Sequence, residues 1–281
     1  MLSAVEHQRI LSAHLIPEGE FNSMPYADVN GQHIRYEDTG TDLPVVLCSH
    51  GFLMNHTMFD HQVAALEQEF RVVRWDERGF GDTPATDPFT YWDSANDAVA
   101  LLDYLGIDQA VFAGMSQGGY LSLRAALAHP DRVRALVLMN TCHDMDNAET
   151  HAGNQQLLEA WEAGAYDEVA PMIAQIILGP EEHWEPWINL WKSIDMAGLK
   201  HASACLLGKD DIEGRIGEIK APALVVHGTE DSAIHINRAR SMAAALKDCR
   251  GIVEVQGAAH AANLTHPAAV NPPVLDFLRG L

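Results

Sequence analysis

The sequence is poor in cysteine and lacks long apolar segments. It has 281 residues and four cysteines, which are widely spaced and include no C-x-x-C pair. A disulfide framework is therefore not predicted, and free thiols in a reducing compartment are expected. The first residues contain no apolar run of the length found in a signal peptide, and no segment is long enough to span a bilayer. We therefore expect a cytoplasmic protein.

Positive charge is also scarce. The chain has 18 Lys and Arg against 39 Asp and Glu, which gives a formal net charge of −21. A field of this sign repels phosphate backbones and anionic lipid headgroups, so neither nucleic acid nor a membrane is an expected partner. A well-solvated surface is the simplest interpretation of the acidity. The sequence leaves the oligomeric state open, and a homodimer is one of the states it allows.

Internal repeats are absent, and short apolar runs alternate with helical periodicities instead. The pair Asn30-Gly31 predicts a hairpin between strands at about 24–29 and 33–38, because both residues of such a turn need positive φ. Further strands are predicted at 44–48, 71–75, 110–113, 134–139, 223–226 and 251–255. Helices are predicted at 57–69, 94–105, 117–129, 235–247 and 267–279. This alternation predicts an α/β fold with a mostly parallel sheet covered by helices on both faces.

One stretch breaks the alternation. Residues 142–215 have a helical pattern, are rich in Trp and Met, and contain no clear strand. We interpret them as a helical cap inserted between two strands, and ordinary surface helices on the same core are the alternative. The core then comprises residues 23–141 and 216–281. Residues 1–22 form an N-terminal extension with a short amphipathic helix and a loop.

The motif G-M-S-Q-G at residues 114–118 lies at the junction of a predicted strand and a predicted helix. A serine on such a sharp turn projects its hydroxyl from the edge of the sheet. The turn brings the residues two before and two after the serine close together, which explains the small residues Gly114 and Gly118. The N-terminal end of the helix favours a developing anion. Ser116 is therefore the candidate nucleophile, and a simple helix N-cap is the alternative.

A serine hydroxyl needs a base, and the base needs an orienting acid. His260 ends the motif G-A-A-H, directly after the strand predicted at 251–255. Asp231 ends the motif H-G-T-E-D, directly after the strand predicted at 223–226. Both lie where parallel strands end, the edge at which open α/β sheets place their sites. The two side chains are our candidates for base and acid.

Other acids and histidines are open to the same roles. Glu230 adjoins the chosen acid, and Asp144 or Asp146 follows the strand predicted at 134–139. Among 15 histidines, His227 ends a predicted strand and is interpreted as a packing residue near the site. His266 precedes a proline and is interpreted as a helix start.

The oxyanion of an acyl-transfer reaction needs two backbone donors. One is expected to be the N–H of Gln117, the residue after the candidate nucleophile. The second is expected from the loop S-H-G-F at 49–52, where Gly51 lets the backbone turn inward and Phe52 supplies the N–H.

The segment D-E-R-G-F-G-D at 76–82 also concentrates charge and glycine. We interpret it as a tight structural loop held by hydrogen bonds of Asp76 and Arg78.

Together these motifs resemble the α/β-hydrolase superfamily. The resemblance spans about residues 24–281, and the stretch 110–141 is similar to the branch of 3-oxoadipate enol-lactonases, small carboxylesterases and cofactor-free haloperoxidase-like hydrolases. The matching motifs are H-G-F (50–52), D-E-R-G-F-G-D (76–82), G-M-S-Q-G-G (114–119), H-P-D-R-V (129–133), G-T-E-D (228–231) and G-A-A-H (257–260). The resemblance implies the α/β-hydrolase fold and Ser-His-Asp acyl transfer with neither a metal nor an organic cofactor.

The expected activity is hydrolysis of a small apolar carboxylic ester or lactone. Epoxide hydrolases and haloalkane dehalogenases carry Asp where this chain has Ser116, which argues against both. A carbon–carbon bond hydrolase or a perhydrolase with the same triad stays open, although the bulky F-L-M at 52–54 does not match the Gly-rich loop of the carbon–carbon hydrolases. A non-catalytic ligand-binding receptor on the same fold is the alternative of another class, and an intact triad argues against it.

Overall fold

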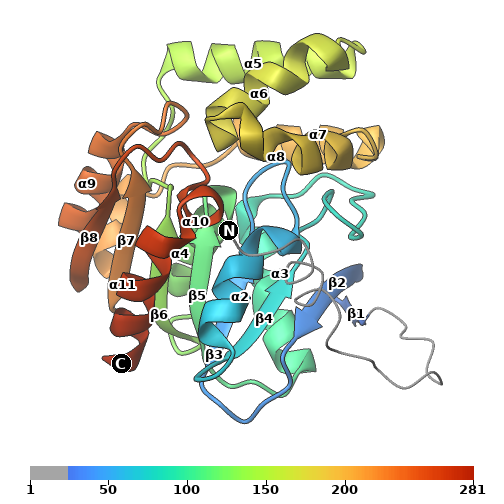
Figure 1. Cartoon of the computed structure of the whole chain (residues 1–281). Helices are drawn as coiled ribbons and strands as arrows, with labels where there is room; N and C mark the ends of the chain where they lie inside the picture. The colour runs from blue at the N-terminus through green and yellow to red at the C-terminus, as the bar shows by residue number, and fades with distance from the viewer. Residues whose placement is uncertain (1–24) are drawn as a thin grey trace, which may run out of the picture.

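The computed structural model describes residues 25–281, so the predicted N-terminal extension at 1–22 lies outside the described residues. Eight strands form one sheet in the order β1-β2-β4-β3-β5-β6-β7-β8 (Figure 1). The strands are β1 (Tyr26–Val29), β2 (Gln32–Asp38), β3 (Val45–Ser49), β4 (Arg71–Trp75), β5 (Ala110–Met115), β6 (Val133–Met139), β7 (Ala223–Gly228) and β8 (Cys249–Val255). Every predicted strand is present; β4 has its predicted bounds, and the ends of the other strands differ from prediction by at most two residues.

The sheet is parallel from β4 through β8 and antiparallel only at the end formed by β1 and β2. The hairpin between β1 and β2 turns at Asn30 and Gly31, whose φ angles are 49° and 73°. Side chains of β5 and β7 are buried throughout, which is why these strands read as unbroken apolar runs. The predicted fold class is confirmed.

Helices cover both faces of the sheet, as Figure 1 shows. On one face α2 packs against α11, and on the other α3 packs against α4 while α9 packs on β7 and β8. Their bounds are α2 (Asp60–Leu66), α3 (Tyr91–Tyr104), α4 (Gln117–Ala128), α9 (Ile236–Ala245) and α11 (Pro267–Arg279), with the short 3-10 turns η1 (His56–Phe59) and η3 (Glu213–Glu218) and the short helix α10 (Ala262–Thr265) between them.

Helix α3 begins at Tyr91 rather than at the predicted residue 94 because a capping box starts it. The Thr90 side chain accepts a hydrogen bond from the Asp93 N–H, and the Asp93 carboxylate accepts one from the Thr90 N–H. Tyr91 is itself buried on the same face as Ser94 and Ala95, so the apolar face of the helix begins one turn earlier than predicted.

Between β6 and β7 the chain forms four α helices, here called the helical segment (Figure 1). These are α5 (Ala148–Glu162), α6 (Tyr166–Leu178), α7 (Trp184–Trp191) and α8 (Met196–Leu207), with the 3-10 turn η2 (Glu181–His183) before α7. Trp191 is buried, contacts the ring of Trp161 edge to face, and donates a hydrogen bond from Nε1 to the Leu53 carbonyl at 2.7 Å. The large aromatic side chains thus hold the helical segment together and attach it to the loop after β3.

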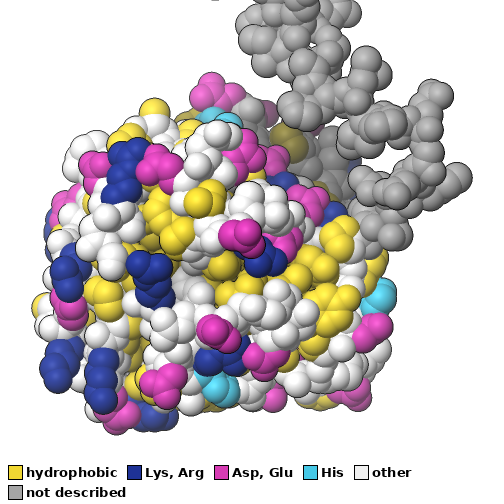
Figure 2. Space-filling model, turned by 90° about the horizontal axis from the view of Figure 1, so that it is seen from below, with side chains coloured by type: hydrophobic (Ala, Val, Ile, Leu, Met, Phe, Trp, Pro, Cys, Tyr) yellow, Lys and Arg dark blue, Asp and Glu magenta, His cyan; other side chains and the backbone are white. Residues whose placement is uncertain are grey.

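The molecular surface opposite the helical segment carries charges of both signs. Figure 2 shows Lys and Arg side chains interspersed with Asp and Glu there, with hydrophobic side chains exposed only in small areas. Within residues 25–281, no helix combines the length and the apolar character needed to cross a membrane.

The loop after β4 is held by buried ion pairs, with Glu77 as an exception. Asp76 accepts hydrogen bonds from the backbone N–H groups of His56 at 2.7 Å and Asp82 at 3.0 Å, and Arg78 donates to Asp97 at 2.8 Å. Both Glu77 oxygens are buried and have no hydrogen-bond partner within residues 25–281. The loop is therefore structural, as its sequence suggested, but it contains one uncompensated carboxyl group.

Burial raises the pKa of Glu77 to about 8 and outweighs the nearby hydroxyl of Ser94, amide of Gln117 and charge of Arg78, which lower it; the charge of Asp97 raises it further. The folded protein therefore holds a proton that the unfolded chain releases near pH 4.5. The stabilising contribution of this proton is complete below that pH and is lost as the pH rises through about 8.

We expect the free energy of unfolding to fall between pH 6 and pH 8.5 by on the order of 2 kcal/mol from this group, and Glu77→Gln to remove most of that fall. Urea unfolding at a series of pH values measures it. Glu168→Gln, at an exposed position of α6, is the matched control and should retain the wild-type slope. Equal slopes for Glu77→Gln and the wild type would show that Glu77 is ionised in the folded state.

Candidate active site

Ser116 occupies a strained backbone position between β5 and α4. Its φ is 52° and its ψ is −113°, a conformation that residues with a side chain rarely adopt. The Ser116 N–H donates to the Met139 carbonyl at 2.9 Å, and the Thr141 hydroxyl donates to the Ser116 carbonyl at 2.8 Å. The neighbouring strand β6 and the loop after it therefore hold the strained turn in place.

Glycines make this turn sterically accessible. A Cβ atom on Gly114 would lie 2.1 Å from the Gly118 carbonyl oxygen, and one on Gly118 would lie 1.9 Å from the Ser49 carbonyl oxygen. Both distances are far shorter than any real contact of a Cβ atom, so only glycine fits. Gly119 is similarly confined, since its Cβ would lie 2.5 Å from the side chain of Thr141. The close approach predicted for residues 114 and 118 is present, whereas the contacts with Ser49 and Thr141 were not predicted.

The imidazole of His260 is hydrogen-bonded to the carboxylate of Asp231. The distance between His260 Nδ1 and Asp231 Oδ2 is 2.9 Å, although the two residues lie on the different loops that follow β8 and β7. Because an ionised carboxylate only accepts hydrogen bonds, the proton is assigned to Nδ1. The other ring nitrogen, Nε2, is then left with a free lone pair.

Asp231 is surrounded by donors. The N–H groups of Ala233 and Ile234 donate to Oδ1 at 3.0 and 2.9 Å, and Asn140 Nδ2 donates to Oδ2 at 2.9 Å. Burial raises the pKa of Asp231, but the charge of His260 and hydrogen bonds from His227 and His260 outweigh it and hold the pKa well below its usual range. Asp231 is therefore ionised throughout the physiological pH range.

The rival acids lie elsewhere. Asp144 and Asp146 both pair with Arg238, at 2.9 and 2.7 Å, and Glu230 is exposed. His227 Nε2 lies 2.7 Å from the Ile234 carbonyl oxygen and 3.2 Å from Asp231 Oδ2. This histidine therefore contacts the acid and not the pocket.

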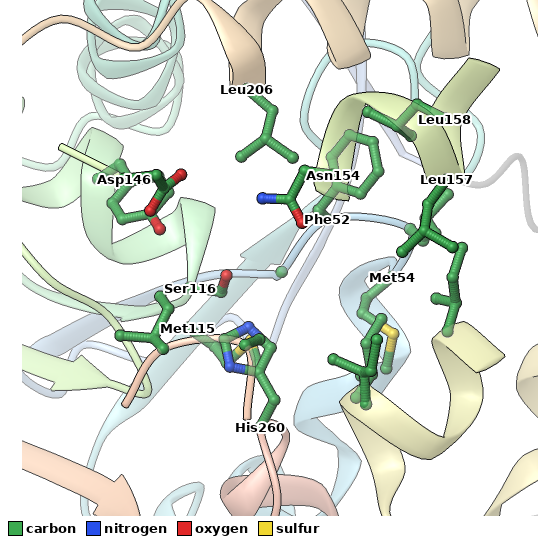
Figure 3. A pocket seen from close by; sticks show the side chains of 18 residues that line it. Phe52, Met54, Met115, Ser116, Asp146, Asn154, Leu157, Leu158, Leu206 and His260 are labelled. Atoms are coloured by element: carbon green, nitrogen blue, oxygen red, sulfur yellow. The ribbon is translucent and has the colours of Figure 1, made fainter. Parts of the chain in front are cut away.

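Ser116 and His260 line one pocket between the sheet and the helical segment (Figure 3). The empty space of this pocket, including its mouth, is about 820 Å³. The structure has no hydrogen bond between Ser116 Oγ and His260. Within residues 25–281, no three His, Cys, Asp or Glu side chains are grouped so that they could hold a metal ion.

The pocket wall is mostly aliphatic. None of the four tryptophans of the helical segment lines it. The lining residues are Gly51, Phe52, Leu53, Met54, Met115, Ser116, Tyr120, Asp146, Asn154, Leu157, Leu158, Ile173, Ile176, Ile177, Leu206, Ala233, Ile234 and His260. The side chains that shape the pocket thus come from α5, α6 and α8 as well as from the loops of the sheet.

His50 fixes the orientation of the peptide between Gly51 and Phe52. Its Nε2 accepts a hydrogen bond from the Glu77 N–H at 2.9 Å, so Nδ1 carries the proton and donates to the Gly51 carbonyl at 2.8 Å. Burial lowers the pKa of His50, which keeps the ring neutral. In a trans peptide the C=O and the following N–H point in opposite directions, so the Phe52 N–H is turned away from the ring.

Several residues of the site were not assigned a role from the sequence. His50 lies in the H-G-F motif, where the position of the histidine was visible but its partner Glu77 was not. Asn140 has a φ of 45°, which asparagine tolerates, and its amide reaches Asp231 and the Ala259 carbonyl. A single asparagine after a strand carries no recognisable sequence signal for this contact.

Comparison with known proteins agrees with the fold described above. The family model described as the alpha/beta hydrolase fold matches residues 44–171. A putative carbamate hydrolase RutD of Variovorax paradoxus is 30% identical over 258 residues, which cover 87% of this chain and 96% of that protein. The 3-oxoadipate enol-lactonase 1 of Acinetobacter baylyi is 24% identical over 88% of this chain and 94% of its own length.

A solved structure shows the same architecture. The enol-lactonase from Burkholderia xenovorans superimposes with a TM-score of 0.83 at 28% identity, covering 91% of this chain and 100% of that one. These relatives are hydrolases, which supports a hydrolase role for this chain. The resemblance noted in the sequence is confirmed: the chain belongs to the α/β-hydrolase superfamily.

Proposed function

We propose that the protein hydrolyses a carboxylic ester or lactone through a Ser-His-Asp acyl-enzyme mechanism, with Ser116, His260 and Asp231 in these roles. One observation carries the proposal. A serine held in a strained strand-to-helix turn shares a pocket with a histidine whose Nδ1 lies 2.9 Å from a buried carboxylate. This arrangement leaves Nε2 of the histidine as a base on the side of the serine.

In the first half of the reaction His260 Nε2 takes the hydroxyl proton of Ser116 as Oγ bonds to the substrate carbonyl carbon. The carbonyl electron pair moves to its oxygen, and the N–H groups of Phe52 and Gln117 bind that oxyanion. When the tetrahedral intermediate collapses, the bond to the leaving oxygen breaks and His260 protonates that oxygen. Asp231 remains ionised and stabilises the imidazolium.

In the second half water replaces the alcohol. His260 Nε2 takes a proton from this water, whose oxygen attacks the acyl carbon, and the same two N–H groups bind the oxyanion again. Collapse breaks the bond to Ser116 Oγ, which recovers its proton from His260 as the acid leaves. No step requires a metal ion or an organic cofactor.

The pocket supports an apolar substrate of small or medium size, because aliphatic side chains form most of its wall. The names of the relatives, a putative carbamate hydrolase and enol-lactonases, both describe cleavage next to a carbonyl group. The same chemistry is proposed for this chain.

We expect Ser116→Ala to lower kcat for p-nitrophenyl esters by at least about 10⁴-fold, because the attacking atom is removed. Hydrolysis of short and medium esters and of simple lactones measures this. Ser193→Ala, at an exposed position after α7, is the control and should retain full activity. A fluorophosphonate should label the wild type but not Ser116→Ala. Folded wild type that is neither labelled nor active would instead support a ligand-binding receptor, and turnover of a vinylogous diketone alone would favour carbon–carbon hydrolysis.

We expect kcat/KM to fall on the acid side of the pH profile, because a protonated imidazole cannot act as the base. Asp231 does not contribute to this fall, since its pKa lies well below its usual range and it stays ionised. A pH–rate profile on one ester between pH 4 and pH 9 tests this. A rate that is constant down to pH 4 would rule out His260 as the base.

A further inference from the structure

The pocket has two chemically different sides. Figure 3 shows Asp146 on one side of Ser116, and Met54, Leu157 and Leu158 on the other. Apart from Ser116 and His260, the polar groups in the lining are the carboxylate of Asp146, the amide of Asn154 and the phenol of Tyr120, and Asp146 is the only carboxylate among them. A charged group in such a wall is costly unless it has a function or a full set of partners.

The partners of Asp146 are incomplete. Its Oδ1 accepts a hydrogen bond from Arg238 Nη1 at 2.7 Å, but its Oδ2 accepts none within residues 25–281. Lys209 Nζ lies 3.6 Å from Oδ2, which is too long for a hydrogen bond. The carboxylate is therefore anchored by one oxygen and has an unused acceptor on the other.

Unused donors lie beside this acceptor. Lys209 is 94% buried, since only 6% of its surface is exposed, and its Nζ has no hydrogen-bond partner within the described chain. Its Nζ lies 4.2 Å from the ring centre of Tyr120, which also lines the pocket. The Tyr120 hydroxyl makes only a weak contact with Cys142 Sγ, at 3.8 Å, and has no other hydrogen-bond partner within residues 25–281.

The charges at this side cancel. Arg238 and Lys209 are positive, and Asp144 and Asp146 are negative, so the cluster has no net charge to offer an ionic ligand. A carboxylate on the substrate would be repelled by Asp146, and an ammonium group would find the charge of Asp146 already balanced by Arg238 and Lys209. A hydroxyl group fits, because it donates to a carboxylate oxygen and accepts from a phenol or an ammonium group.

We propose that Asp146 and Tyr120 bind a hydroxyl group of the substrate, so that the preferred substrate is an ester or lactone with a free hydroxyl on one of its two halves. The hydroxyl donates to Asp146 Oδ2 and accepts from the Tyr120 O–H. The opposite, apolar side takes the other half of the substrate. This inference rests on the proposed function and names its substrate class.

The test compares matched esters. In one series the p-nitrophenyl esters of hexanoic acid, 6-hydroxyhexanoic acid and adipic acid differ only in ending with a methyl, a hydroxymethyl or a carboxylate group. Acetate esters of hexanol, hexanediol and 6-hydroxyhexanoic acid complete the set. In at least one series the hydroxyl ester should exceed the methyl ester in kcat/KM by about tenfold, the effect of one hydrogen bond to a charged group.

Two variants locate the preference. Asp146→Asn should reduce the hydroxyl-to-methyl ratio toward one and raise kcat/KM for the carboxylate ester, because Lys209 and Arg238 then face only Asp144. Tyr120→Phe should reduce the ratio several-fold while leaving the charges unchanged. Asp144→Asn is the matched control, since Asp144 pairs with the same Arg238 but does not line the pocket, and it should retain the ratio.

The outcomes separate the two proposals. Turnover of all three esters without a hydroxyl preference overturns this inference and leaves the proposed function in place. An equal loss of preference in Asp146→Asn and Asp144→Asn also overturns it, since a general effect of charge would then be the cause. Folded wild type, verified by circular dichroism and its Tm, that cleaves none of the esters overturns both.

Discussion

The backbone crowding around Ser116 is the constraint on which the rest of the site depends. The turn requires the backbones of β3, β5 and α4 to approach so closely that no Cβ atom fits at Gly114 or Gly118. This contact fixes the loop after β3, which supplies Phe52, relative to the N-terminus of α4, which supplies Gln117. The strained φ at Ser116 is maintained by two hydrogen bonds: the Ser116 N–H donates to a carbonyl of β6, and the Thr141 hydroxyl donates to the Ser116 carbonyl. The crowding therefore fixes the position of Ser116 relative to the two backbone N–H groups that are proposed to bind the oxyanion.

Two buried carboxyl groups show how the surroundings decide ionisation. Asp231 accepts hydrogen bonds from two backbone N–H groups and one amide, and it adjoins two imidazoles, so its pKa is depressed despite burial. Glu77 is buried beside the same site without hydrogen-bond partners in the described chain, and its pKa is raised to about 8. The backbone of Glu77 nevertheless serves the site, because its N–H fixes the tautomer of His50. In Glu77 the protonation of the side chain and the hydrogen bond of the backbone N–H thus have different effects.

The sequence predicted the fold and the candidate triad because both rest on local signals. Unbroken apolar runs marked the buried strands, and β4 and α11 begin and end where predicted. The pairing of Asp231 with His260 was predictable because both residues directly follow strands of one parallel sheet. By contrast, Asp146 and Arg238 lie 92 positions apart on a loop and a helix face, and no local pattern indicates that they meet. Similarly, residues 142–215 are visibly rich in tryptophan, but the sequence does not show which of these rings pack within the helical segment.

The sequence predicts the loops of the sheet better than the pocket wall, and these two parts of the site have different roles. In the proposed mechanism the loops at the carboxyl ends of the strands carry the reacting groups, and the geometry of the sheet allows little change in their positions. The walls of the pocket come largely from α5, α6 and α8. In the proposed mechanism their side chains contact the substrate and take no part in the bond changes. A change from leucine to asparagine on α5 would alter the polarity of the pocket without moving Ser116. Relatives that are 24–30% identical to this chain can therefore share a type of reaction and differ in substrate. The polar side formed by Asp146 and Tyr120 is accordingly explained by contacts within this chain.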